Sequence, residues 1–356
     1  MEIGIVGLPN VGKSSLFNAL TKASVPAENF PFTTIQPNVG VVPVPDPQLD
    51  FLAQFYKSPK IVPANVRFVD IAGLVPGASK GEGLGNQFLS HIREVDAIAQ
   101  VVRCFESAEV VNVMGSLGPQ RDAEVITTEL ILADLEQAQK SRDKYTGAAR
   151  TGEEEAKKRL AFLDDVTKGL NEGITLRKMN VDPAFVKDYS FLTAKPVLYV
   201  ANVNEKTSPS LWGEVQAFAA EQKATAIQIN VKLEGEIVSL SPEEQETYRT
   251  ELGIKESGLG VLARAGQELL RQITFFTAGP KEAHAWNVVR GDSVVKAAGK
   301  IHSDMEKGFI RAEIFNVKDL QVLGSEAAVK AAGKVRMEGR DYIAQDGDIV
   351  VIHFKV

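Results

Sequence analysis

Residues 7–14 are Gly-Leu-Pro-Asn-Val-Gly-Lys-Ser, the pattern G-x-x-x-x-G-K-S of a phosphate-binding loop. An apolar run at residues 2–6 predicts a strand before this loop, and residues 13–21 predict a helix after it. Such a loop turns tightly at its glycines, so that backbone N–H groups and the positive end of the helix face phosphate oxygens. Lys13 is expected to reach the β- and γ-phosphates, and the Ser14 hydroxyl is expected to bind Mg²⁺. The expected nucleotide-binding residues of the loop are Asn10, Val11, Gly12, Lys13, Ser14 and Ser15.

Strands and helices alternate along much of the chain. The predicted strands lie at residues 2–6, 39–42, 66–70, 97–102, 196–202 and 226–229. The predicted helices of this pattern lie at residues 13–21, 87–95 and 260–272. This alternation is typical of an α/β fold with a parallel sheet covered by helices on both faces.

Two charged helices, predicted at residues 122–144 and 153–171, interrupt the alternation and are joined by a loop at 146–152. Apolar positions in the second helix recur at spacings of four and three, which predicts an antiparallel coiled-coil hairpin. The first helix places glutamine and lysine in this seam beyond Ala133, so the far end is expected to be weakly packed and solvated. We interpret the hairpin as an arm that contacts a partner, with a helical decoration that has no role as the alternative.

The last part of the chain changes character near Ile273. Short runs at residues 309–315 and 349–354 alternate with glycine turns, and one short helix is predicted at 329–332. This predicts a small β-rich domain. The expected parts are a phosphate-loop domain at 1–117 and 191–272, the inserted arm at 118–190 and the β-rich domain at 273–356.

Two further motifs predict a nucleotide switch. Thr34, with Thr33 as the alternative, offers a hydroxyl to Mg²⁺ when the γ-phosphate is present. Residues 70–73 are D-x-x-G at a strand end, where Asp70 is expected to hold Mg²⁺ through water and the Gly73 N–H to contact the γ-phosphate. Loss of that phosphate would release both loops. Leu74 stands where signalling GTPases have a glutamine that orients the attacking water, so intrinsic turnover is expected to be slow.

The base-reading motif departs from the guanine pattern. The strand predicted at 196–202 leads into Asn202-Val203-Asn204-Glu205, where N-K-x-D is expected. The aspartate of N-K-x-D accepts hydrogen bonds from guanine, and Glu205 is one methylene too long to do the same. Because a lost polar pairing removes discrimination, the sequence predicts a site that is not selective for guanine. Residues 230–232 lie where such domains place a second base-contacting loop, with a plain loop as the alternative.

Composition limits the function classes. The chain has 356 residues, 44% hydrophobic and 24% charged, which is ordinary for a globular protein of two or three domains. A net charge of −6 disfavours nucleic-acid binding over the whole surface, so any such contact must be a local patch. Cys104 is the single cysteine, which excludes an intramolecular disulfide. Without a basic leader or an apolar run of about 20 residues, a soluble cytoplasmic protein with no membrane partner is expected.

The chain resembles the YchF family of Obg-like ATPases. The residues that carry the resemblance are those at 7–15, 29–38, 70–86, 202–205 and 299–313. It implies a G-domain with an inserted coiled coil and a C-terminal TGS domain of β-grasp type. It also implies binding of ATP more strongly than GTP, with Mg²⁺ as cofactor, and association with the ribosome through the large subunit in translation or stress response. A monomer is expected, with RNA contacts through the TGS domain and the arm.

The resemblance also assigns individual residues. Asn202 and Val203 are expected to line the adenine pocket, with Glu205, Asn230 and Val231 nearby. The expected catalytic residues are Lys13, Gly73 and Asn112. Asn112 stands where relatives commonly have a histidine proposed to position water, and asparagine cannot shuttle protons near neutral pH. There are two alternatives. One is a GTPase that acts in ribosome assembly, and the other is a binding module in which the bound nucleotide only stabilises the interaction surface.

Overall fold

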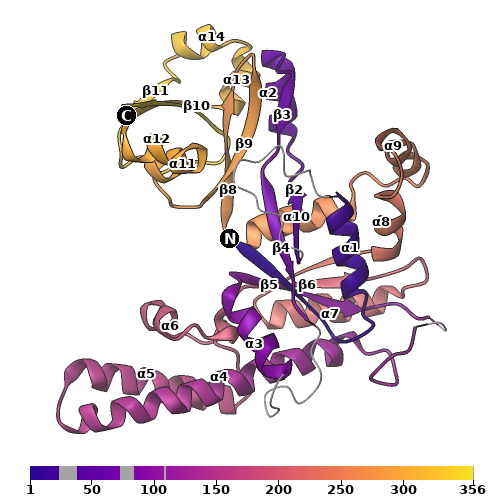
Figure 1. Cartoon of the computed structure of the whole chain (residues 1–356), viewed down its shortest axis with the longest axis vertical. Coiled ribbons are helices and arrows are strands. Elements are labelled where there is room, and N and C mark those ends of the chain that lie inside the picture. The colour runs from indigo at the N-terminus through magenta and orange to yellow at the C-terminus, as the bar shows by residue number, and fades with distance from the viewer. Residues whose placement is uncertain (24–37, 73–83, 108–109, 356) are drawn as a thin grey trace. The chain divides into compact units, whose positions relative to one another are not determined.

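The computed structural model describes residues 1–23, 38–72, 84–107 and 110–355 (Figure 1). The chain forms two compact units. One contains Arg67–Leu262 together with the N-terminal segment, and the other contains Val41–Val66 and Ala263–Val356. Within the described residues, no helix combines the length and the apolar character needed to span a membrane.

The first sheet has six strands in the order β2-β4-β1-β5-β6-β7. They are β1 (Glu2–Val6), β2 (Val39–Pro43), β4 (Asn65–Asp70), β5 (Ala97–Arg103), β6 (Val197–Asn202) and β7 (Thr225–Ile229). The pairs from β4 through β1, β5 and β6 to β7 are parallel. Every residue of β5 and β6 is buried, as expected for central strands covered on both faces. The parallel sheet predicted from the alternation is therefore confirmed.

Helices follow most of these strands. They are α1 (Lys13–Ala23), α3 (Leu84–Glu94), α4 (Pro119–Arg150), α7 (Pro209–Glu221), α8 (Val231–Ile237), α9 (Pro242–Glu251) and α10 (Gly258–Leu269). Helix α1 packs on β1 and α8, whereas α4 packs on β5 and α7. The carboxyl ends of β1, β5, β6 and β7 meet at one edge of the sheet, which is where ligands of parallel α/β sheets bind.

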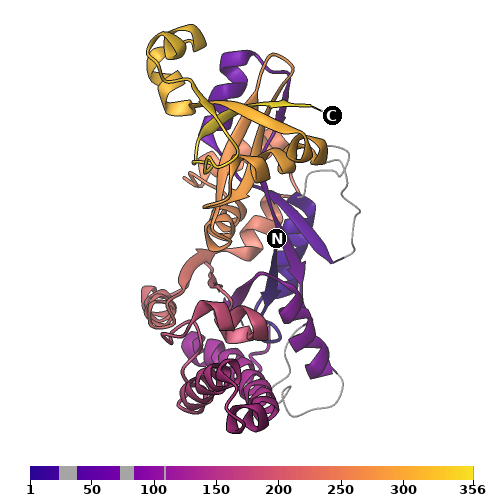
Figure 2. The same ribbon diagram turned by 90° about the vertical axis from the view of Figure 1, so that its left-hand side faces the viewer.

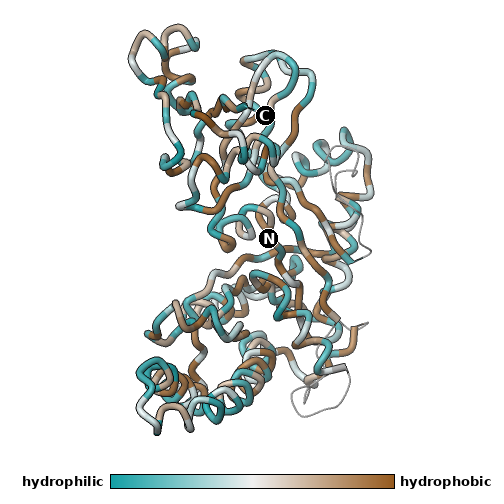
Figure 3. Tube along the Cα trace, turned by 60° about the vertical axis from the view of Figure 1, so that its left-hand side comes forward, coloured by the Kyte–Doolittle hydropathy of each residue, from teal (hydrophilic) through white to brown (hydrophobic). Residues whose placement is uncertain are grey.

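The inserted arm is a hairpin of α4 and α5 (Glu154–Asn171), which lie side by side in Figures 1 and 2. Helix α6 (Pro183–Tyr189) and a short 3₁₀ turn (Leu192–Ala194) follow it. The base of the hairpin has an apolar core in which Leu163 is fully buried and the rings of Phe162 and Tyr189 stack. In α4 no residue after Ala138 is buried, and Figure 3 shows hydrophilic residues on the outer turns. The predicted solvation is therefore confirmed for the outer turns of α4, whereas Ala156 near the start of α5 is buried.

The predicted loop of the arm is longer than the observed one. Helix α4 continues to Arg150 because Ala148 and Ala149 favour helix, so that Thr151–Glu153 alone connect it to α5. Gly152 has φ +98, a left-handed conformation that glycine adopts without strain.

The second unit contains a sheet in the order β11-β10-β12-β8-β9-β3. Its strands are β3 (Lys60–Val62), β8 (Gln272–Ala278), β9 (Glu282–Val289), β10 (Phe309–Asn316), β11 (Arg336–Glu338) and β12 (Asp348–Phe354). Antiparallel hairpins flank the central parallel pair of β8 and β12, which is the expected β-grasp arrangement. The helices of this unit are α2 (Pro47–Tyr56), α11 (Val294–Ile301), α12 (Ser303–Lys307), α13 (Val317–Leu323) and α14 (Glu326–Ala331). Two apolar cores, one with α2, α13 and α14 and one with α11, lie on the sheet.

The second unit differs from the sequence prediction in two respects. The single helix predicted at 329–332 corresponds to α14, and the structure adds α11, α12 and α13. Residues 41–66, predicted within the phosphate-loop domain, group with the C-terminal residues. They do so because α2 buries Leu49 and Leu52 in this core and β3 pairs with β9.

Cys104 should be inert in the folded protein. Its side chain is fully buried, and burial raises the pKa of its thiol to about 12, with the charges of Glu214 and Asp122 contributing. At pH 8 the nucleophilic thiolate is therefore scarce as well as inaccessible. We expect mass spectrometry to find no alkylation by iodoacetamide in native protein and one adduct in protein unfolded by guanidinium. Rapid stoichiometric alkylation of native protein would contradict this environment.

Candidate nucleotide-binding site

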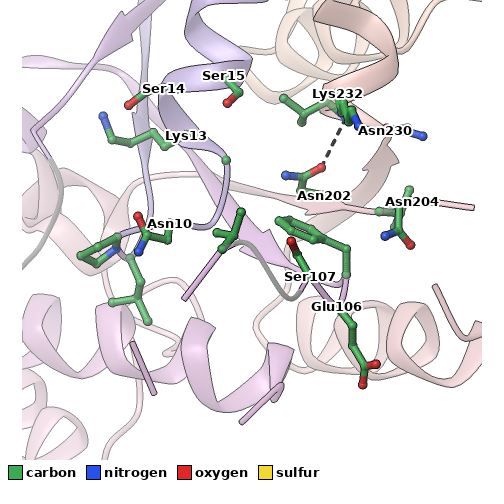
Figure 4. Close-up of a pocket in the computed structure, with 17 residues that line it drawn as sticks. Asn10, Lys13, Ser14, Ser15, Glu106, Ser107, Asn202, Asn204, Asn230 and Lys232 are labelled. Atoms are coloured by element: carbon green, nitrogen blue, oxygen red, sulfur yellow. Dashed lines mark hydrogen bonds between the residues drawn. The ribbon is translucent and has the colours of Figure 1, made fainter. Parts of the chain in front are cut away.

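A pocket of about 770 Å³ lies at the carboxyl edge of the first sheet (Figure 4). The segments that follow β1, β5, β6 and β7 form its walls. Its lining residues are Leu8, Pro9, Asn10, Gly12, Lys13, Ser14, Ser15, Phe105, Glu106, Ser107, Val110, Asn202, Val203, Asn204, Asn230, Val231 and Lys232. The volume falls within the range of small-molecule sites, about 300–1,000 Å³.

The phosphate loop has the backbone that its glycines predict. Gly12 has φ +99, and a Cβ there would lie 2.2 Å from the side-chain Nδ2 of Asn202. A Cβ on Gly7 would lie 2.8 Å from a methyl group of Val11. Asn10 is also left-handed, with φ 65, a conformation that asparagine tolerates better than most residues. Leu16 N donates to Gly12 O over 2.9 Å, so the helix begins immediately after the loop. The N-terminal amides of α1 therefore face the pocket.

Asn202 connects two walls of the pocket. Its Nδ2 donates to Val11 O over 2.9 Å, and its Oδ1 accepts from Val231 N over 3.3 Å, the bond drawn in Figure 4. The residue is 5% exposed, so these bonds are shielded from water. One side chain thus fixes the phosphate loop against the turn between β7 and α8. This is a positioning role, in addition to the predicted place in the base pocket.

Lys13 and Asp70 form an ion pair. The Lys13 ammonium donates to the Asp70 carboxylate, and the two side chains are 12% and 27% exposed. Lys13 begins α1 and Asp70 ends β4, and both belong to the predicted phosphate and metal site. In the structure the Lys13 ammonium is paired with the Asp70 carboxylate, and a bound triphosphate would compete with that carboxylate for the ammonium.

Phe105 contributes an aromatic side chain to the lining of the pocket. It follows β5, and the guanidinium of Arg103 lies 4.6 Å from the centre of its ring. Arg103 is 4% exposed and donates to the carbonyl oxygens of Phe105, Val110 and Val111. The buried arginine therefore holds together the segment that carries Phe105.

Sequence reasoning missed Phe105. The available signal was its position directly after a predicted strand of a parallel sheet, at the edge where ligands bind. Asn204, which lines the pocket beside Val203, lies within the quoted base motif but was not assigned a role.

Of the other residues predicted for the base site, some line the pocket and Glu205 does not. Val203, Asn230 and Val231 line the pocket, and the Asn230 Oδ1 also caps α8 by accepting from Leu233 N. Glu205 does not line it; this exposed residue lines an adjoining pocket of about 300 Å³. Glu106 lines both pockets, and in Figure 4 its carboxylate points away from Asn202.

Asn112 is placed outside the pocket lining. Its Oδ1 accepts from Met114 N and its Nδ2 donates to Ser116 O, both over 2.9 Å. The side chain thus stabilises a local turn in this state, and a water-positioning role requires it to leave that turn. Thr33, Thr34, Gly73 and Leu74 lie outside the described residues.

The donor set fits Mg²⁺. Ser14 contributes a hydroxyl to the pocket, and the Asp70 carboxylate is beside Lys13. Hydroxyl and carboxylate oxygens are the hard ligands that Mg²⁺ takes, and it usually binds through one or two protein groups plus phosphates and water. The described residues contain no group of three His, Cys, Asp or Glu side chains suited to a metal ion.

Comparison with known proteins agrees with this architecture. A family model described as a 50S ribosome-binding GTPase matches residues 2–145, and the model YchF-GTPase_C, described as a protein of unknown function, matches residues 272–355. The "Ribosome-binding ATPase YchF" of Haemophilus influenzae is 48% identical over 361 residues, covering 100% of this chain and 99% of its own. The chain belongs to the YchF family.

Other YchF proteins are similar over the same extent. The "Ribosome-binding ATPase YchF" of Bacillus subtilis is 45% identical, with both chains covered completely. The solved structure of the Schizosaccharomyces pombe YchF GTPase has a TM-score of 0.87 and 36% identity, covering 99% of this chain and 97% of its own. The YchF fold, including the C-terminal unit, is therefore shared along the whole chain.

In this YchF chain, Asn202→Ala should weaken nucleotide binding by roughly tenfold or more, because the phosphate loop loses its buried tether. The free energy of unfolding should fall by about 1–3 kcal/mol, since two buried hydrogen bonds are lost. Isothermal calorimetry with Mg-ATP and urea unfolding measure the two effects. Asn171→Ala, at an exposed asparagine in the arm, is the matched control. An affinity within twofold of the unmodified protein would refute the tether.

Proposed function

We propose that this protein binds Mg-ATP, hydrolyses it slowly and associates with the ribosome, through the large subunit, in translation or stress response. It accepts GTP more weakly. The observation that carries the proposal is a single pocket that joins a phosphate loop to an aromatic and amide-lined base end.

The base end favours adenine over guanine recognition. A guanine site needs a carboxylate that accepts from N1–H and the 2-amino group. Glu205 does not line the pocket, and the carboxylate of Glu106, which does line it, points away from Asn202.

Asn204 and Asn230 present neutral amides there, and Phe105 offers an aromatic face. The side-chain oxygens of Asn204 and Asn230 already accept hydrogen bonds within the protein, so their NH₂ groups remain to donate. A donor suits the N1 lone pair of adenine.

Ser14 and Asp70, with Thr34, are the residues that would hold Mg²⁺. When bound, the ion would neutralise phosphate charge. Lys13 would leave Asp70 for the β- and γ-phosphates, and the amides of residues 10–15 would orient the chain of phosphates. The Gly73 N–H would contact the γ-phosphate. These groups hold and orient the substrate.

Slow hydrolysis follows from the lack of an assigned water-positioning group. Leucine at position 74 cannot hydrogen-bond to water, and Asn112 is engaged in its own turn. We propose that Asn112 turns toward the attacking water only in a state that a partner stabilises. Turnover would then depend on that partner.

Support for the ribosome comes from the relatives. The proteins of Haemophilus influenzae and Bacillus subtilis are named as ribosome-binding ATPases, and the N-terminal family model is described as 50S ribosome-binding. We propose RNA contacts through the C-terminal unit and the arm, for a cytoplasmic monomer. The predicted division into G-domain, arm and TGS domain belongs to the same proposal.

Two alternatives have specific support. The Schizosaccharomyces pombe relative is named a YchF GTPase, which favours GTP as the substrate, as in the alternative of a GTPase. The engaged Asn112 side chain favours a binding module that its nucleotide only stabilises.

Titration with fluorescent ATP and GTP analogues decides base choice. We expect ATP to bind more tightly than GTP by on the order of tenfold, because the pocket lacks the guanine carboxylate. Lys13→Ala should abolish measurable binding of both by removing the phosphate cation, and Lys296→Ala, at an exposed lysine of the second unit, should change neither. A clear preference for GTP would reject the ATP assignment.

Single-turnover hydrolysis separates the switch from the binding module. We expect a rate at or below about 10⁻² s⁻¹ for protein alone, as for NTPases without an external activator, and faster turnover with ribosomes. Asn112→Ala should lower the ribosome-stimulated rate while leaving ATP affinity unchanged. No hydrolysis under either condition would leave only the binding module.

A further inference from the structure

Arg103 carries a charge that is buried beside the nucleotide pocket. It ends β5, opposite Asn202 of β6, and is 4% exposed. Its Nε, Nη1 and Nη2 donate to the carbonyl oxygens of Phe105, Val111 and Val110 over 3.1, 3.3 and 2.9 Å. Within the described parts of the chain, the guanidinium is paired with these oxygens and with no carboxylate. A buried charge is costly unless its donors are satisfied, so the guanidinium and the three carbonyl groups stabilise each other's positions.

One of these carbonyl groups also joins the phosphate loop. The Val111 oxygen accepts from Arg103 Nη1 and, over 3.2 Å, from Asn10 Nδ2. The described residues that follow β5 are therefore bonded to the end of that strand and to the phosphate loop. Phe105 and Val110, which belong to them, line the pocket.

The guanidinium also contacts the aromatic ring of Phe105. It lies 4.6 Å from the ring centre, within the range of a cation–π interaction. Phe105 lines the pocket and Arg103 does not, so the guanidinium can act on a ligand only through its neighbours. Its planar fork of donors spans several acceptors at once, which the single ammonium of a lysine cannot do.

We infer that Arg103 positions Phe105 against the base of the bound nucleotide, and so contributes to affinity for the base without contacting the ligand. The inference rests on the proposed binding of ATP in this pocket and names a positioning residue for its base end. The phosphate loop keeps its own tether to Asn202, so the contribution of Arg103 is confined to the base end.

Two ligands separate the base end from the phosphate end. Isothermal calorimetry compares Mg-ATP with Mg-tripolyphosphate, which has three phosphates and no base. Arg103→Lys should weaken ATP binding by roughly tenfold, because the ammonium cannot hold three carbonyl groups and the ring. It should change tripolyphosphate affinity by less than about twofold, since the phosphate loop is still tethered. Asn202→Ala, by contrast, should weaken binding of both ligands.

Arg177→Lys is the matched control. Arg177 is a half-buried arginine of the same unit that donates to the carbonyl oxygens of Thr193 and Gln222, and it does not line the pocket. Its replacement should change the affinity for neither ligand. Arg103→Gln, which keeps a neutral donor and buries no charge, takes the place of Arg103→Lys if thermal unfolding shows that the lysine variant does not fold.

A double variant tests whether Arg103 acts through the ring. Phe105→Leu removes the ring and keeps an apolar side chain. In that background Arg103→Lys should weaken ATP binding by less than about twofold more, whereas the effects of two independent groups would multiply.

The outcomes separate this inference from the proposed function. Equal ATP affinity of Arg103→Lys and Arg177→Lys would overturn the positioning role. So would an equal loss of ATP and tripolyphosphate affinity, which indicates a general structural role, or multiplied effects in the double variant. A preference of the unmodified protein for GTP would reject the proposed ATP assignment. The positioning role would still stand if Arg103→Lys then lowered GTP affinity and left tripolyphosphate affinity unchanged, and absence of binding of either nucleotide would reject both.

Discussion

The side-chain amide of Asn202 is the constraint on which the nucleotide site depends. It stands at the end of a fully buried strand and bonds to the phosphate loop on one side and to the β7–α8 turn on the other. This close approach requires glycine at position 12, because any Cβ there would collide with the amide. The phosphate loop and the β7–α8 turn are therefore tied to each other through one buried side chain.

The ion pair of Lys13 and Asp70 sets the electrostatics of the same site. Each group would be costly to leave unpaired when partly buried, and each satisfies the other. On the proposed function, Lys13 would pair with phosphate oxygens and the Asp70 carboxylate would be left to hold Mg²⁺. Binding of the triphosphate and of the metal ion would then be coupled through one exchange of partners.

Sequence patterns predicted the parts of the fold in which local signals and burial agree. The glycines and lysine of residues 7–14 define a loop whose backbone is the binding surface, so the motif carries its own geometry. Apolar runs that end at Asp70 and Asn202 predicted strands, which the sheet confirms. The arm followed from its heptad spacing, although the helix former Ala149 extended α4 beyond the expected loop.

Other features depend on contacts between distant residues. The pairing of Lys60 with Glu282 joins β3 to a strand more than 200 positions later, and no local pattern in residues 60–62 indicates it. Phe105 lines the pocket because the buried Arg103 gathers the carbonyl groups around it. Glu205 was assigned by its place in a motif, whereas the turn after β6 leaves it exposed and outside the pocket lining. In each case tertiary contacts, rather than periodicity, decide the position.

The central claim is that the amino-terminal loop holds a triphosphate and its metal ion. A crystal structure with Mg²⁺ and a non-hydrolysable ATP analogue tests it most directly. The account predicts phosphates surrounded by the amides of residues 10–15, with the Lys13 ammonium moved from Asp70 to the phosphate oxygens and the base beside Phe105. A loop without nucleotide at saturating analogue, with Lys13 still paired to Asp70, would contradict it.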